Sequence, residues 1–258
     1  MKKLVTAACA LVAGIAMADV TSGNTVGYSE VAAREGLTFY APQFLGIGVR
    51  TIDINAIQLD DDGAGNVGWG DVMQIVGPLG NASAMYDYWD KSLYSGAEPL
   101  TQNYWSADGG ATVADISFDA GDGVAIDNPN GNAFNIKNSG EVYTNTVEIA
   151  AVEGLNWSGN PFPESISIRA VQLDDDGAGN VGWGDVMQIV GPLGNASAMY
   201  DYWDKSLYAG AEPLTQNYWS ADGGATVADV TLTQGAGFAI DNPNGNNFTI
   251  KIACPFTL

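Results

Sequence analysis

The chain has 258 residues, of which 30 are acidic and 9 are basic, so its formal net charge at pH 7 is −21. Nucleic acid and anionic membrane surfaces are therefore excluded as main partners, because both require basic patches that displace counterions. The chain contains no histidine, which rules out Ser-His, Cys-His and zinc-His catalytic sets. With 46% hydrophobic and 15% charged residues, it should fold around a substantial core.

The first eighteen residues have the three parts of a secretory signal peptide. Two lysines precede an uncharged apolar run, Leu4–Met17, and the small-residue sequence A-M-A ends at Ala18. This run is shorter than the about 20 apolar residues that a membrane span needs. We therefore predict a signal peptide at residues 1–18 and a secreted protein, extracellular or on a bacterial cell surface, without membrane insertion.

A long block of the sequence occurs twice. Gln58–Asp115 returns as Gln172–Asp229 with a single difference, Ser95 against Ala209. An earlier segment, from Glu30 to Phe39, also returns, and its spacing shows that the first copy has four extra residues between Tyr40 and Thr51. Such duplication predicts two units with the same backbone and the same task. We assign repeat 1 to residues 19–139 and repeat 2 to residues 140–258.

Short runs of alternating apolar and polar residues predict strands in both copies. In T-I-D-I-N-A-I-Q-L, for example, Ile52, Ile54 and Ala56 fall on one face. Turn sequences rich in Asp, Asn and Gly, such as D-D-D-G and D-N-P-N-G-N, separate the runs. About eight or nine strands per unit are typical of an antiparallel sandwich. The predicted fold is all-β, with two tandem antiparallel β-sandwich (jelly-roll-like) repeats; one larger pseudo-symmetric sandwich is the alternative.

The run D-D-D-G-A-G-N opens each identical block and suggests a calcium loop. Calcium loops place oxygen ligands at alternate positions and use glycine to bend the chain. The run follows that rhythm at its start, but Gln58 stands where a carboxylate is expected and no glutamate occupies the twelfth position. A solvated Asp/Gly turn is the alternative. The candidate Ca²⁺ ligands are Asp60, Asp62, Asn66 and Asp71 in the first copy and Asp174, Asp176, Asn180 and Asp185 in the second.

Aromatic residues are the second chemical signal of the duplicated block. In A-M-Y-D-Y-W, alternation places Tyr86 and Tyr88 on one face of a strand and Trp89 on the other. An exposed aromatic row can stack on sugar rings, whereas a covered row packs in a core or an interface. The candidate glycan or interface aromatics are Trp69, Tyr86 and Tyr88, and their equivalents Trp183, Tyr200 and Tyr202.

Cys254 is the only cysteine that remains after the predicted cleavage. It has no intramolecular partner, although the predicted compartment allows disulfides. We interpret it as a small hydrophobe near the terminus, with an intermolecular disulfide as the alternative.

Several short motifs resemble those of secreted, largely uncharacterised β-sandwich repeat proteins of Gram-negative bacteria. They are N-T-V-G-Y at 24–28, G-E-V at 140–142, G-N-P-F-P at 159–163 and G-x-G-F-x-I at 235–240. The second copy has N-T-V-E-I in place of N-T-V-G-Y. The resemblance implies export, tandem repetition and surface association, and it brings no catalytic residues.

These observations predict a protein that is not an enzyme. Its carboxylates cluster in turns, and no spacing marks a catalytic pair such as a glycosidase needs. The first hypothesis is an exported structural or adhesive protein of the cell surface or of an extracellular fibre. It would self-associate through the segment Asp19–Tyr28 or through an unpaired C-terminal strand in I-K-I-A-C-P-F-T-L. The alternative is a carbohydrate-binding module protein with calcium-stabilised loops.

Overall fold

The computed structural model describes residues 26–67, 74–76, 85–94, 100–181, 188–190, 199–208 and 214–256, with the backbone alone at 74–76 and 188–190. The predicted signal peptide lies outside these ranges. Every strand pair in the described part of the chain is antiparallel. The all-β prediction is therefore confirmed.

The strands of the first half form sheets with one another, and we name residues 26–142 unit 1. One sheet has the order β1-β11-β3, with β5 also paired to β11; a second has the order β2-β10-β6-β7-β8; and β4 pairs with β9. Their bounds are β1 Val26–Ala32, β2 Gly36–Tyr40, β3 Phe44–Leu45, β4 Thr51–Asp53, β5 Gln58–Asp60, β6 Gln74–Val76, β7 Met85–Trp89, β8 Tyr104–Ser106, β9 Ser117–Asp119, β10 Val124–Asn128 and β11 Asn135–Val142.

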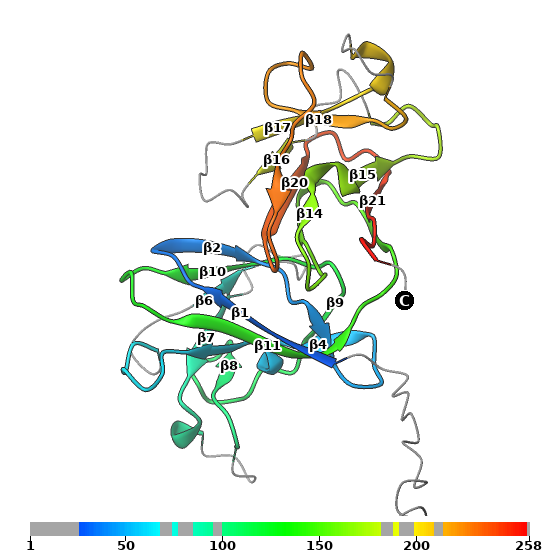
Figure 1. Ribbon diagram of the computed structural model, residues 1–258. Helices are drawn as coiled ribbons and strands as arrows, with labels where there is room; N and C mark the ends of the chain where they lie inside the picture. Colours follow the sequence, from blue (N-terminus) through cyan, green and yellow to red (C-terminus); the bar gives the residue numbers. More distant parts are fainter. Residues whose placement is uncertain are drawn as a thin grey trace, which may run out of the picture.

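The strands of the second half also form sheets with one another, and we name residues 147–256 unit 2. Its sheets have the orders β12-β21-β15 and β13-β20-β16-β17-β18, and β14 pairs with β19. The bounds are β12 Val147–Ala150, β13 Gly154–Gly159, β14 Ile166–Ser167, β15 Val171–Asp174, β16 Gln188–Val190, β17 Met199–Trp203, β18 Tyr218–Ser220, β19 Thr231–Leu232, β20 Gly237–Asn242 and β21 Thr249–Ile252. In Figure 1, unit 2 (light green to red) lies above unit 1 (blue to green).

The two identical blocks adopt the same pairing over their described residues, as predicted. In unit 1, Asp87 of β7 faces Ser106 of β8, and in unit 2 the equivalent Asp201 faces Ser220. A difference appears where the copies differ in length, because unit 1 has the additional strand β3, which pairs with the end of β11.

Two expectations about strand ends are corrected. The predicted boundary between residues 139 and 140 falls inside β11, whose residues Glu141 and Val142 still pair with β3. The C-terminal strand β21 is not an open edge, because β12 pairs with one side of it and β15 with the other. Local sequence patterns do not contain either point, because pairing partners at least 75 residues away determine them.

The run T-I-D-I-N-A-I-Q-L is not one continuous strand. A 3-10 turn, η1 Ile54–Ala56, separates β4 from β5, and the side chain of Asp53 accepts a hydrogen bond from the amide of Asn55 at its start. The turn lets both Ile54 and Ile57 become buried, which strict alternation does not allow. The other described 3-10 turns are η2 Lys91–Leu93, η3 Ile168–Ala170 and η4 Lys205–Leu207.

Each unit has its own hydrophobic core. Trp105 and Trp219 are fully buried in the two cores, and their indole N–H groups donate to Ile57 O and Val171 O, both at 2.8 Å. Ala120 and Tyr143 pack against both cores, so the connection between the units lies against each of them. Cys254 is partly buried against the core of unit 2, in keeping with the interpretation as a small hydrophobe.

Candidate functional site

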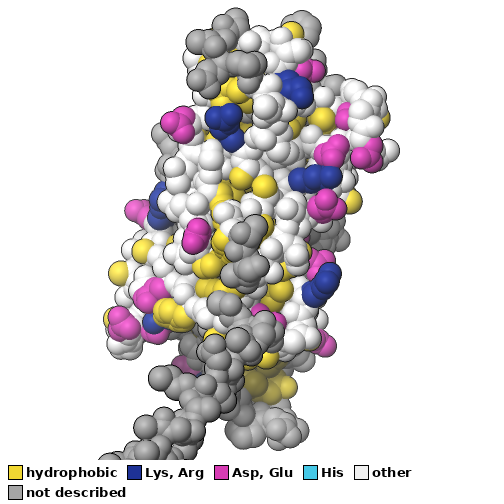
Figure 2. Space-filling model, turned by 45° about the vertical axis from the view of Figure 1, so that its right-hand side comes forward, with side chains coloured by type: hydrophobic (Ala, Val, Ile, Leu, Met, Phe, Trp, Pro, Cys, Tyr) yellow, Lys and Arg dark blue, Asp and Glu magenta, His cyan; other side chains and the backbone are white. Residues whose placement is uncertain are grey.

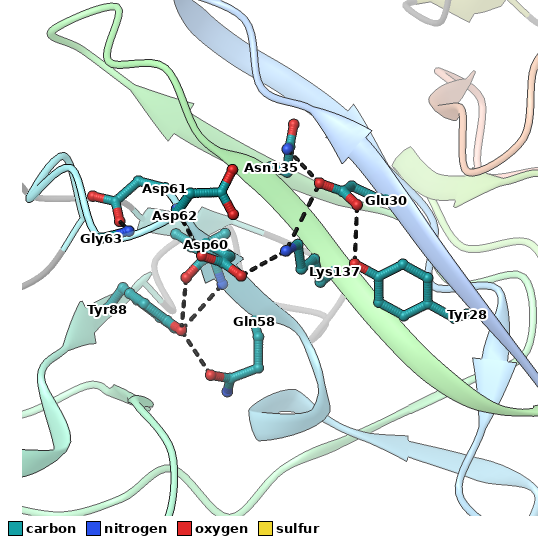
Figure 3. A network of polar contacts seen from close by, with 11 residues as sticks. Tyr28, Glu30, Gln58, Asp60, Asp61, Asp62, Gly63, Tyr88, Asn135 and Lys137 are labelled. Atoms are coloured by element: carbon teal, nitrogen blue, oxygen red, sulfur yellow. Dashed lines mark hydrogen bonds and ion pairs between the residues drawn. The ribbon is translucent and has the colours of Figure 1, made fainter.

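The exposed face of the sheet formed by β1, β11 and β5 carries a polar network (Figure 3). Strand register places Glu30 beside Lys137, and the Lys137 ammonium lies 2.5 Å from Asp60 Oδ2 and 3.8 Å from Glu30 Oε1. The hydroxyl of Tyr28 donates to Glu30 Oε2 at 3.0 Å, and the side-chain amide of Asn135 donates to Glu30 Oε1 at 2.5 Å. The network thus joins three strands across one face.

The ion pair in this network shifts the pKa values of both of its members, Asp60 and Lys137. The Lys137 ammonium, with the amide of Asp62 as a second donor, holds the pKa of Asp60 below its ordinary value. The same carboxylate raises the pKa of Lys137. Asp60 is therefore a charged carboxylate at neutral pH. Its Oδ2 is paired with the Lys137 ammonium, and its Oδ1 accepts from the amide of Asp62.

Unit 2 carries the equivalent network with fewer members. The Lys251 ammonium lies 2.7 Å from Asp174 Oδ2 and 3.5 Å from Glu148 Oε1. By sequence, Thr146 occupies the position of Tyr28, and Thr249 that of Asn135. The exposed tyrosine and the asparagine are therefore special to unit 1.

The acidic loops are closed by an aspartate that the calcium pattern did not select. Asp61 Oδ1 accepts from the amide of Gly63 at 2.9 Å, and Oδ2 accepts from the amides of Asn66 and Val67. Burial raises the pKa of Asp61, but these backbone donors outweigh it and the net pKa is lowered. Asp175 makes the same contacts in unit 2.

The predicted calcium ligands do not converge in the described residues. Asp60 binds Lys137, Asp62 is exposed with φ 56°, and the side-chain amide of Asn66 donates to Ala133 O at 2.8 Å. Asp174, Asp176 and Asn180 have the equivalent positions. Asp71 and Asp185 lie outside the described residues. Within the described ranges no group of three or more His, Cys, Asp or Glu side chains could hold a metal ion. Calcium binding stays a prediction.

Two of the candidate glycan or interface aromatics are core residues. Tyr88 and Tyr202 are each 2% exposed, and burial raises the pKa of Tyr88 to about 12. The Tyr88 hydroxyl donates to Gln58 Oε1 at 2.8 Å and accepts from the amide of Leu59 at 3.1 Å, and Tyr202 bonds Gln172 and Leu173 in the same way. These partners lie about 30 residues away, so the strand pattern could not show them. Stacking on a glycan is therefore excluded for Tyr88 and Tyr202 in this fold.

The remaining aromatic candidates divide into two groups. Tyr86 and Tyr200 are partly buried and pack against the cores of their units. Trp69 and Trp183 lie outside the described residues.

A second candidate surface, which the predictions from sequence do not include, is the junction between the units. The turn that precedes β10 brings Gly121 against Val147 and Ile149 of β12, and the equivalent turn before β20 brings Gly235 against Val31 and Tyr40 of unit 1. Each unit therefore inserts a glycine turn beside the first strands of the other. We call this the turn junction.

Reciprocal backbone contacts hold the turn junction together. The amide of Gly159 donates to Gly121 O at 3.1 Å, and the equivalent amide of Ala41 donates to Gly235 O at 2.9 Å. Isolated bridges join Asp122 to Ser158 and Tyr40 to Ala236. A Cβ atom on Gly237 would lie 2.5 Å from the backbone nitrogen of Tyr40, so the close approach depends on glycine.

Equivalent residues meet one another at the centre of the turn junction. Phe39 and Trp157 occupy the same position of the two units and stack with ring centroids 5.2 Å apart and an interplanar angle of 16°. Together with the reciprocal bridges, this is the pattern of an isologous interface, in which each partner uses the same patch. The sequence signal was the repeated G-x-G, at 121–123 and 235–237, outside the identical blocks.

Comparison with known proteins gives no relative: no protein-family model, no curated protein and no solved structure matches the chain. In the described part of the chain, no helix is long and apolar enough to cross a bilayer.

Proposed function

We propose that this protein is an exported structural or adhesive protein, built of two β-sandwich (jelly-roll-like) units, that self-associates at the cell surface or in an extracellular fibre. The observation that carries the proposal is a pair of equivalent outer strand edges. Within the described residues, β1 pairs with β11 alone and β12 pairs with β21 alone. Unpaired strand edges readily recruit another strand.

The turn junction supports an open rather than a closed assembly. At this junction, the same patch of each unit packs against the other unit within one molecule, so neither patch is free to bind a second copy. The edges β1 and β12 belong to the two different units. Pairing of β1 in one copy with β12 in the next would be a heterologous contact, and such contacts give filaments when the rotation does not close.

The surface chemistry sets the conditions for assembly. Figure 2 shows acidic side chains spread over the visible face, with fewer basic ones between them and hydrophobic side chains in a central band. The net charge of −21 opposes association at low ionic strength. We therefore expect assembly to require salt or divalent cations, which screen the repulsion.

The geometry of β1 provides a sharp test. The amide of Ala33 donates to Phe134 O across the ladder at 3.0 Å. Because successive residues of an antiparallel strand direct their N–H groups alternately to the two sides, the amides of Tyr28 and Glu30 point away from β11. Tyr28→Pro removes one outward N–H and keeps the β11 ladder, whereas Tyr28→Ala removes the same side chain and keeps the N–H.

The experiment is sedimentation velocity of the mature chain in salt and in calcium, with negative-stain imaging. We expect the wild type and Tyr28→Ala to form filaments or large assemblies, and Tyr28→Pro to stay small at an unchanged melting temperature. A monomeric wild type at high protein concentration in both conditions would refute the proposal. Equal assembly of the two variants would show that β1 is not the edge that associates.

Glycan binding is the second candidate, and one observation favours it. Tyr28 is 55% exposed beside the carboxylate of Glu30 and the amide of Asn135. An exposed aromatic ring next to such polar groups suits stacking on a sugar. A glycan array would test it: binding by the wild type that Tyr28→Ala loses supports this role, and absence of binding by the wild type removes it.

A further inference from the structure

Four polar side chains of unit 1 meet in the interior next to the turn junction. Ser29 and Asn138 face each other across β1 and β11, and the hydroxyl of Ser29 donates to Asn138 O at 3.4 Å. The Tyr40 side chain extends from β2 toward that of Ser29, but the two hydroxyls do not have the geometry of a hydrogen bond. Gln43 follows in the chain, and its backbone N–H donates to Asn138 Oδ1 at 3.2 Å. These residues are 0–3% exposed.

Unit 2 closes this cluster from the other side. The position of a Cβ atom on Gly235 lies 3.3 Å from Tyr40 Cε2 and 3.6 Å from Gln43 Cδ. The side-chain amide of Gln43 also donates to Phe162 O of unit 2 at 2.7 Å. The cluster is thus sealed by the turn junction.

Three polar atoms of this cluster have no hydrogen-bond partner among the described residues: Tyr40 Oη, Gln43 Oε1 and Asn138 Nδ2. The orientation of the two amides is fixed by their other atoms. Gln43 Nε2 donates to Phe162 O, and Asn138 Oδ1 accepts from the amides of Gln43 and Phe44. Rotation of either amide would therefore break existing bonds rather than pair the remaining atom.

We propose that this cluster is an internal hydration site that holds water between unit 1 and the turn of unit 2. A buried unpaired polar group is costly, and internal waters typically make about three hydrogen bonds to such groups. The three atoms match water in kind: Asn138 Nδ2 donates, Gln43 Oε1 accepts, and the Tyr40 hydroxyl can do either. All four side chains are neutral, and burial keeps the Tyr40 phenol protonated by raising its pKa, so a neutral ligand fits better than an ion.

The second unit supplies an internal comparison. The positions of Ser29, Tyr40, Gln43 and Asn138 are occupied there by Val147, Ser158, Pro161 and Ile252. Ser158 donates directly to Gly121 O at 2.9 Å, and the other three side chains have no polar atom. The equivalent place in unit 2 therefore needs no water, and the site belongs to unit 1 alone.

The sign of the effect of Tyr40→Phe shows whether the Tyr40 hydroxyl has a hydrogen-bond partner, and the crystal structure described below shows whether that partner is water or Ser29. If the hydroxyl bonds an internal water, its removal leaves that water and its other partners short of a hydrogen bond, and we expect the melting temperature to fall by about 2–4 °C. If the hydroxyl has no partner, its removal takes away a desolvation cost, and the melting temperature rises or stays the same. The second result would overturn the proposal.

A double-mutant cycle and a direct observation complete the test. Tyr40→Phe and Asn138→Leu should be energetically coupled through the shared water, because the two side chains have no direct hydrogen bond. A high-resolution crystal structure of the wild type should show ordered water within hydrogen-bond distance of Tyr40 Oη, Gln43 Oε1 and Asn138 Nδ2. Density in which these atoms bond one another instead would refute the site. Because the test depends on the monomer interior, its outcome is independent of whether the protein assembles.

Discussion

Asp122 offers the clearest prediction, because it places a carboxylate inside the turn junction. Its Oδ2 accepts from the amide of Asp119 at 2.8 Å, and its backbone bridges to Ser158 of unit 2. Burial, and to a smaller degree the nearby Asp119 carboxylate, raise the pKa of Asp122 from 3.8 to about 6. Asp119 belongs to the same turn, and β13, which packs against it, contributes no titratable side chain.

The direction of the pH effect follows from this raised pKa. Between pH 3.8 and about 6 the folded state binds more protons than the unfolded state, so stability falls as pH rises through this window. The full difference between pKa 3.8 and 6 corresponds to about 3 kcal/mol. Since Asp122 keeps some contact with solvent, we expect about 1–2 kcal/mol in practice.

The perturbation is Asp122→Asn, which keeps an oxygen to accept from the amide of Asp119. We expect the variant to be more stable than the wild type by about 1–2 kcal/mol at pH 7.5 and to lose this advantage near pH 4. Urea denaturation at a series of pH values measures both the gain in stability at pH 7.5 and its loss near pH 4. Ala236→Asp, which places an acid at the equivalent position of the other turn, should add a loss of stability with rising pH. A difference between wild type and Asp122→Asn that does not change with pH would show that Asp122 does not titrate with a raised pKa.

Two further predictions concern the glycine turns and the acidic loops. Gly123→Ala should destabilise the protein by more than about 2 kcal/mol, because its Cβ would overlap the backbone of Ser158. Gly179→Ala has open space around it and should lower the free energy of unfolding by only about 1 kcal/mol, because of its positive φ. Equal losses of stability in urea denaturation would contradict the close packing at Gly123. If the acidic loops bind calcium, millimolar calcium should raise the melting temperature and EDTA should reverse the increase. An unchanged melting curve, without bound metal in native mass spectrometry, would show that the loops do not bind calcium.

The duplicated sequence was the strongest source of correct prediction. It required the two blocks to adopt one backbone, and the registers of β7 with β8 and of β17 with β18 agree residue for residue. It also located the difference between the units in the Tyr40–Thr51 segment, where β3 adds to unit 1. Local patterns succeed here because turn chemistry and side-chain alternation act between neighbours in the chain.

The candidate site was less predictable. The calcium pattern selected Asp60, whose partner is Lys137, and passed over Asp61, which closes the loop. The three aspartates are chemically identical in the sequence. Which carboxylate meets a lysine depends on the pairing of β5 with β11, about 77 residues away, and no local pattern contains that information.

By itself, the sequence determined the all-β class, the duplication and the acidic surface, since composition, repetition and period-two alternation depend only on residue types and their order. Tertiary structure alone decided which aromatics are buried, which strand edges stay open and how the units meet. Tyr88 is in the core because Gln58 and Leu59 satisfy its hydroxyl, and β21 is closed because two strands flank it. The turn junction requires Gly121 and Gly235 to meet strands of the opposite unit, a contact that exists only after both units have folded.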